Sequence, residues 1–195
     1  MDEKKSKLII KRPSWRNIVF TILIVLLLAP PTRKPIQVAL NRLKLSLFTP
    51  SVIDNGQQEK LPPFNYQVVT LGGSHEAIPI GSGDITFLSY WATWCPPCIA
   101  ELPSIEKLYV DYGDKVNFVL VSQEDPIIIQ QFLKKKSLSI PAVTSTMPTP
   151  ETLYTSSIPT NYIIDQSGHI LVKELGASDW NSDDVRQLLD SLLAN

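Results

Sequence analysis

Cysteine and histidine are scarce in this chain, whose 195 residues contain two of each. A structural zinc site needs four ligands, which are most often cysteine and histidine. Beside the two cysteines only His75 and His169 remain, and they form no second pair at ligand spacing. The sequence therefore predicts no metal site.

An excess of charge of one sign is also absent, because 18 lysine and arginine residues stand against 19 aspartate and glutamate residues, for a net charge of −1. Nucleic-acid-binding domains are usually strongly basic, so no nucleic-acid partner is expected. No nicotinamide or flavin motif is present either. Any redox chemistry must then use the chain's own side chains, without a bound cofactor.

The two cysteines that are present stand two residues apart, as Cys95 and Cys98, between a predicted strand and a predicted helix. The first thiol then lies at a helix N-terminus, where free amides and the helix dipole favour a thiolate. The second lies one turn further, close enough to displace a mixed disulfide. A purely structural disulfide is the less favoured alternative, because closing so small a loop removes little chain entropy. The pair predicts a redox-active disulfide.

Residues 61–195 alternate between short apolar runs of strand length and amphipathic runs of helical length. This pattern predicts an α/β domain of roughly 135 residues, enough for one core of its own. Strands are expected at 66–71, 77–80, 85–91, 116–122, 142–144, 160–165 and 169–175, a helical turn at 151–155, and helices at 97–112, at 126–136 and after Asn181 or Ser182.

An uncharged apolar run of 12 residues, 18–29, lies near the N-terminus. With its flanks it extends over about 25 Å as a helix, compared with a hydrocarbon core of roughly 30 Å. Six basic residues precede it, and two prolines occupy the place where a signal-peptide cleavage site would lie. We therefore expect a transmembrane anchor at 17–31 with a cytoplasmic basic head at 1–16, in preference to a removed signal peptide.

Residues 32–60 are expected to connect this anchor to the domain. Apolar residues recur there at helical spacing, which predicts an amphipathic helix. That helix either lies along the membrane surface or packs on the globular domain or on a partner. Polar residues then predict a linker. The apolar positions are Ile36, Ala39, Leu40, Leu43 and Leu47.

Two segments of the domain resemble a known family. They run from Trp94 to Pro103 and, far downstream, from Ile158 to Asp165. Together they resemble the TlpA/ResA-like membrane-anchored thiol-disulfide oxidoreductases of the thioredoxin superfamily, over residues 61–195. The resemblance implies a thioredoxin-like fold, with a central mixed sheet flanked by helices. It also implies a single-pass protein of the bacterial inner membrane whose catalytic domain faces the periplasm.

The resemblance implies roles for three residues on the predicted helix. Cys95 is expected to be the attacking thiolate and Cys98 the resolving thiol. Glu101 lies three residues further on the same helical face, where a poorly solvated carboxylate can accept the Cys98 proton. Its alternative is an ordinary solvated helix position. Ser89 stands where thioredoxin carries a buried aspartate, which leaves Glu101 as the main candidate proton acceptor.

The resemblance also implies a cis peptide bond between Ile158 and Pro159, facing the thiols. Such a bond turns the backbone so that Ile158 can pair with an extended substrate segment. Pro141 is a less favoured candidate for a cis bond. The other residues expected at the substrate-binding surface are Trp94, beside Cys95, together with Pro96 and Pro97.

The expected activity is thiol-disulfide exchange with other proteins, as a protein disulfide reductase. Pro96 removes one amide that could have donated to the Cys95 thiolate, which favours the reducing direction. A membrane thiol reductase is expected to supply electrons, and the process served is cytochrome c maturation or general periplasmic redox homeostasis. A peroxiredoxin-like peroxidase is disfavoured, because Ala92 stands where that chemistry needs a threonine. A non-catalytic client-binding module is the other alternative.

Overall fold

The computed structural model describes residues 14–28, 30–45 and 49–194, and the chain forms two compact units, Met1–Ile36 and Gln37–Asn195. Most of the predicted basic head and Leu47 of the predicted amphipathic segment lie outside the described residues.

Two helices precede the domain, α1 (Trp15–Leu28) and α2 (Pro30–Leu45). Among the described residues, no helix combines the length and the apolar character needed to cross a membrane. The second helix starts earlier than the predicted amphipathic segment, because prolines are tolerated in the first turn of a helix. It also includes Pro35, which lies inside the helix.

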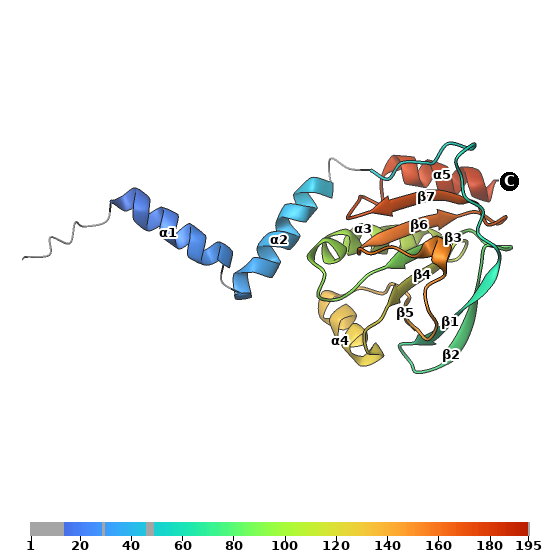
Figure 1. The fold of residues 1–195 in the computed structure, drawn as a ribbon, viewed down its shortest axis with the longest axis horizontal. Helices are drawn as coiled ribbons and strands as arrows, with labels where there is room; N and C mark the ends of the chain where they lie inside the picture. Colours follow the sequence, from blue (N-terminus) through green and yellow to red (C-terminus); the bar gives the residue numbers. More distant parts are fainter. Residues whose placement is uncertain (1–13, 29, 46–48, 195) are drawn as a thin grey trace, which may run out of the picture. The chain divides into compact units, whose positions relative to one another are not determined.

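The domain is built on one seven-stranded mixed sheet with the order β2-β1-β5-β4-β3-β6-β7 (Figure 1). The two central pairs β3–β4 and β4–β5 are parallel, and the remaining pairs are antiparallel. The strands are β1 (Phe64–Thr70), β2 (His75–Ile80), β3 (Thr86–Tyr90), β4 (Asn117–Ser122), β5 (Ala142–Ser145), β6 (Thr160–Ile164) and β7 (Ile170–Leu175). The helices are α3 (Pro96–Tyr112), α4 (Pro126–Lys136), α5 (Asp183–Leu193) and the 3-10 turn η1 (Glu151–Leu153).

These elements confirm the predicted thioredoxin-like α/β architecture, with small differences at their ends. The first hairpin is longer than predicted, since β1 begins at Phe64 and β2 at His75. The turn η1 is shorter, ending at Leu153. Ser182 occupies the N-cap position of α5, although its side chain makes no capping hydrogen bond. Strand ends are set by pairing with neighbouring strands, which a local pattern does not contain.

The core lies on both faces of the sheet, because successive side chains of a strand point to opposite faces. Phe87 of β3 belongs to a large apolar cluster that receives residues from α3, α4 and α5. Its neighbour Leu88 belongs to a second cluster, with Tyr66 of β1 and Tyr162 of β6. Both faces of the central strand β3 are therefore covered. The loop that carries the cysteines begins at the end of this buried strand.

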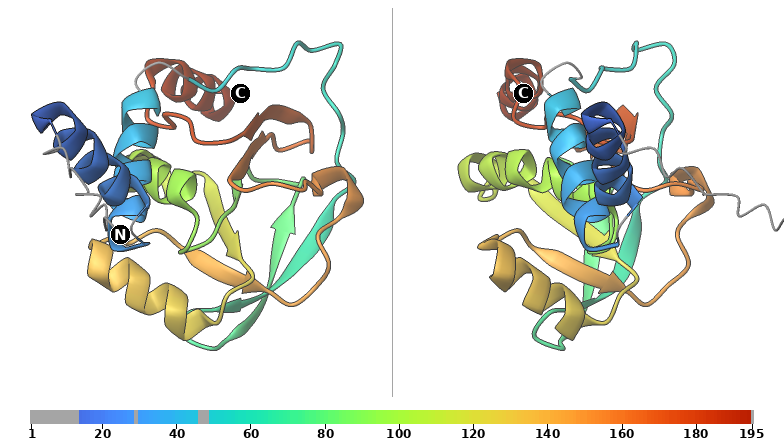
Figure 2. Two further views of the ribbon diagram at one scale, coloured as in Figure 1. Left: turned by 60° about the vertical axis from the view of Figure 1, so that its left-hand side comes forward. Right: turned by 90° about the vertical axis from the view of Figure 1, so that its left-hand side faces the viewer.

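Helices α3 and α5 lie side by side on the domain (Figure 2). The Tyr112 hydroxyl near the end of α3 donates to the Asp190 carboxylate of α5 at 2.8 Å. Arg186 of α5 forms an ion pair with Asp111 of α3. These contacts hold α5, and with it the loop that precedes it, against the helix that carries the cysteines.

Candidate active site

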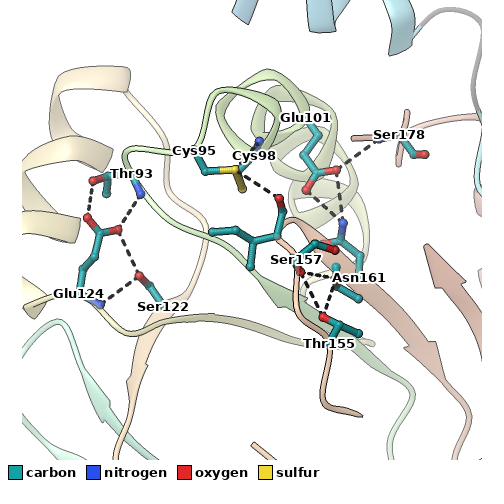
Figure 3. Close-up of a disulfide and its surroundings, with 12 residues drawn as sticks. Thr93, Cys95, Cys98, Glu101, Ser122, Glu124, Thr155, Ser157, Asn161 and Ser178 are labelled. Carbon is teal, nitrogen blue, oxygen red and sulfur yellow. Dashed lines mark hydrogen bonds between the residues drawn. A yellow bond between two sulfur atoms is a disulfide. The ribbon is translucent and has the colours of Figure 1, made fainter. Parts of the chain in front are cut away.

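The two cysteines lie where β3 gives way to α3, and they are joined by a disulfide (Figure 3). Cys95 is the N-cap of α3, and the Cys98 amide donates to its Sγ at 3.3 Å. Pro96 and Pro97 occupy the first helical positions, which suit proline because amides there have no partner within the helix. They carry no amide hydrogen, so neither can donate to the Cys95 sulfur.

Both cysteines are removed from solvent, to different degrees. Cys95 is 3% exposed and Cys98 is 0% exposed. Cys95 is thus the more accessible of the two, by a small margin. Because the second thiol is fully covered, external reagents and client proteins reach the disulfide from the Cys95 side.

The peptide bond between Ile158 and Pro159 is cis, which confirms that prediction. It is the only cis bond among the described residues, so the bond before Pro141 is trans. The Ile158 carbonyl oxygen lies 3.7 Å from the Cys95 Sγ. Pro159 contributes no amide hydrogen at this point. The disulfide and the backbone of Ile158 thus lie close together at one end of the sheet.

A group of hydroxyls holds the loop that carries Ile158. The Thr160 hydroxyl donates to the Ser157 carbonyl oxygen at 2.8 Å. The Thr155 hydroxyl lies 2.9 Å from the Thr160 hydroxyl. Thr155 also donates to Ser157 (Figure 3). Nothing in the sequence marks these residues, since a serine- and threonine-rich loop is ordinary in any domain.

Glu101 is fully buried, so the alternative of a solvated helix residue is wrong. Its carboxylate accepts from the Asn161 side-chain amide at 3.1 Å, from the Trp180 indole at 3.1 Å and from the Ser178 backbone amide at 3.3 Å. Burial raises the pKa of Glu101 to about 8, even though all three donors lower it. This carboxyl group therefore exchanges its proton near neutral pH, one turn of α3 beyond Cys98.

A second carboxylate holds the segment before Cys95 from the other side. Glu124, after β4, accepts from the Thr93 amide and from the Thr93 hydroxyl, both at 2.6 Å. The Ser122 hydroxyl donates to the same carboxylate at 3.2 Å. These bonds connect the loop before the cysteines to the neighbouring parallel strand (Figure 3). The sequence gives no local signal for Glu124, because 31 residues separate it from Thr93.

A cavity of about 290 Å³ opens beside the cysteine loop, between Trp94 and Ile158. Trp94 is 58% exposed, so its ring is available to a bound molecule. Trp91, by contrast, is buried and packs against Phe132 of α4 at 5.9 Å between ring centroids. Of the two tryptophans, Trp94 is therefore the exposed one and Trp91 is part of the core.

Ser89 occupies the buried central strand, as expected, and offers no carboxylate under the cysteines. Among the described residues its hydroxyl has no hydrogen-bond partner. Within the same part of the chain, no cluster of three metal-ligating side chains is found. The site brings together two cysteine sulfurs and one buried carboxyl group.

A thioredoxin-like sheet, a disulfide at a helix N-terminus and a facing cis-proline together define the class of thiol-disulfide oxidoreductases. The family model described as Redoxin matches residues 58–192. The chain belongs to the Redoxin family, among the TlpA/ResA-like thiol-disulfide oxidoreductases.

Individual relatives agree with this assignment. The chain is 29% identical to the thioredoxin-like protein YneN of Bacillus subtilis, over 71% of this chain and 80% of that protein. It is 31% identical to the thiol-disulfide oxidoreductase ResA of Bacillus cereus, over 57% of this chain and 66% of that protein. The crystal structure of StoA from Bacillus subtilis matches with a TM-score of 0.50 and 25% identity, over 69% of this chain and 97% of that structure.

Proposed function

We propose that this protein reduces disulfides of other proteins on the extracytoplasmic side of a membrane. The observation that carries the proposal is the 3.7 Å approach of the Cys95 Sγ to the Ile158 carbonyl oxygen, next to a cis-proline. An extended client segment that pairs with the Ile158 backbone brings its own sulfur to Cys95. Trp94, Pro96 and Pro97 form the rest of the surface that the client contacts.

The reaction begins with the reduced enzyme. The Cys95 thiolate attacks one sulfur of the client disulfide, whose S–S bond breaks as the mixed disulfide forms. The other client sulfur leaves as a thiolate and takes up a proton. Cys98 then attacks the Cys95 sulfur, the Cys95–Cys98 bond forms, and the second client sulfur is released. Two electrons have passed from the enzyme to the client.

Glu101 takes the proton that Cys98 must lose before its attack. A fully buried thiol ionises reluctantly, because desolvation disfavours its thiolate. A carboxyl group with a pKa of about 8 is a matched acceptor near neutral pH. Its hydrogen-bond donors among the described residues are N–H groups, which do not relay a proton, so the proposed transfer runs from the sulfur itself or through a water molecule.

The few donors at Cys95 support the reducing direction. Among the described residues, only the Cys98 amide donates to its sulfur, while Pro96 and Pro97 contribute none. A weakly stabilised thiolate makes the dithiol form a better reductant. Since the sequence carries no motif for a redox cofactor, a membrane thiol reductase recharges the protein. Apocytochromes c and other extracytoplasmic thiol proteins are the clients proposed here.

Two activities measured on the purified domain test this function. The reduced protein should reduce insulin, with precipitation of its chains as the readout. Its equilibrium with glutathione should place it closer to the reducing end than to the oxidising end of the range of about −270 to −120 mV that related folds span. Rapid turnover of peroxide without insulin reduction would favour the peroxidase, and client binding without exchange would favour the non-catalytic module.

We propose residues 17–31 as a single membrane anchor, with the basic head in the cytoplasm. Six basic residues precede the uncharged run and four follow it, which favours this orientation modestly. Protease added to intact spheroplasts should then remove the domain while a cytoplasmic marker survives. A domain that survives until the membrane is broken has the opposite orientation. A domain recovered in the soluble fraction contradicts the anchor.

A further inference from the structure

The loop between β7 and α5 contacts α3 at the residue that accepts the proton. The Trp180 indole N–H and the Ser178 backbone amide both donate to Oε2 of Glu101, at 3.1 and 3.3 Å. The Trp180 backbone amide donates to the Ser104 hydroxyl, which itself donates to the Glu101 carbonyl oxygen. One short loop therefore holds the carboxylate and the helical turn that carries it.

Trp180 is fixed in place by packing as well as by these bonds. It is fully buried, and its ring meets Phe87 of the central strand edge-on, with 5.0 Å between centroids. An immobile indole presents its N–H without a further entropic cost when the carboxylate ionises. The position of the donor is thus set by the core and does not depend on the charge of Glu101.

Asn161 of β6 is the third residue that donates to the Glu101 carboxylate, from the sheet. Its Nδ2 donates to both oxygens of Glu101, at 3.1 and 3.3 Å, while its Oδ1 is buried and has no partner among the described residues. A protonated carboxyl group needs an acceptor for its own hydrogen. Rotation of the Asn161 amide supplies that acceptor, so this side chain can serve both protonation states.

The electrostatic balance at Glu101 is then explicit. Burial favours the protonated form, and so does Glu174 of β7, whose own pKa is raised by burial. The ionised form is favoured by Asn161, Trp180 and Ser178. On α3 itself the titratable groups nearby are the two cysteine thiols of the reduced enzyme. Removing one fixed donor must shift this balance toward the protonated form.

We propose that Trp180 is a positioning residue for disulfide exchange, whose indole N–H stabilises ionised Glu101 and so sets the pH at which this carboxylate accepts the Cys98 proton. This inference rests on the proposed function, in which Glu101 is the acceptor. Trp180 touches neither sulfur nor client. It acts through the carboxylate, from a loop 79 residues away in the chain.

The test removes the indole N–H and follows the carboxyl group itself. In Trp180→Phe, the titration midpoint of Glu101, read from the NMR signal of its ¹³C-labelled carboxyl carbon, should rise by about one to two pH units. The pH profile of single-turnover resolution should move by the same amount. Glu101→Gln identifies the signal. A second variant, with 3-benzothienylalanine at position 180, keeps the ring size while sulfur replaces N–H, and covers the case in which phenylalanine impairs folding.

Phe87→Leu is the matched control, because it loosens the packing of the indole without removing its N–H. Because the N–H remains, Phe87→Leu should shift both midpoints less than the variants at position 180 do, even if it lowers thermal stability. An unchanged Glu101 midpoint in the variants at position 180, or an equal shift in Phe87→Leu, overturns the proposal. The titration of the carboxyl group does not depend on catalysis. If the pH profile of resolution is unchanged in Glu101→Gln, the acceptor role of Glu101 is overturned separately.

Discussion

Cys95→Ser is expected to abolish protein disulfide exchange, whereas Cys98→Ser should retain the first attack and accumulate mixed disulfides with clients. A serine hydroxyl does not attack a disulfide at neutral pH, so loss of the first sulfur removes the whole reaction. The second sulfur is needed only for release. Non-reducing electrophoresis after incubation with a disulfide-bonded client should show the covalent complex for Cys98→Ser alone.

The burial of the two sulfurs gives this prediction an independent check. Cys98 is completely covered and Cys95 retains slight exposure, so a small alkylating reagent should modify Cys95 of the reduced protein faster. The Cys98→Ser protein provides the matched rate for the first thiol alone. Equal alkylation rates for both thiols, or a covalent complex formed by Cys95→Ser, would reverse the assignment of attacking and resolving cysteines.

Glu101→Gln should slow resolution of the mixed disulfide by about 100-fold near pH 8, the low end of general-base effects, because a thiol also ionises partly unaided. The acceptor must be ionised, so its contribution is present above its pKa of about 8 and disappears as the pH falls below it. The wild-type rate should therefore rise through this pH, whereas the variant rises only as Cys98 itself ionises. Single-turnover rates across the pH range measure both.

The pH dependence of the free energy of unfolding tests whether the pKa of Glu101 is raised in the folded protein. Its pKa is about 8 in the folded protein against 4.5 as the ordinary value. Between these values the unfolded chain releases the proton and the folded protein keeps it, so stability falls as the pH rises, by on the order of 5 kcal/mol. Glu101→Gln should lack this fall. Matching pH profiles of rate and stability for the two proteins would assign Glu101 a packing role only.

The class of reaction could be predicted from a few adjacent residues of the sequence. Cys95 and Cys98 lie one helical turn apart, and Pro96 and Pro97 fit the start of a helix, so the disulfide at the N-terminus of α3 followed from local rules. The central strands were equally clear, since a strand covered on both faces is apolar throughout. The cis bond before Pro159 was implied by resemblance, because spacing alone does not distinguish it from other prolines.

The surroundings of the site depended on contacts between distant segments. Trp180 and Asn161 are 79 and 60 residues from Glu101, and nothing in their own neighbourhoods marks them as its donors. A single tryptophan or asparagine is interpreted locally as part of the core or as a polar contact. The packing of α3 against both β6 and the β7–α5 loop removes the carboxylate from water and brings its donors together, and this desolvation raises its pKa. The residue types thus define the class of reaction, while burial in the folded chain sets the pKa of the carboxyl group beside it.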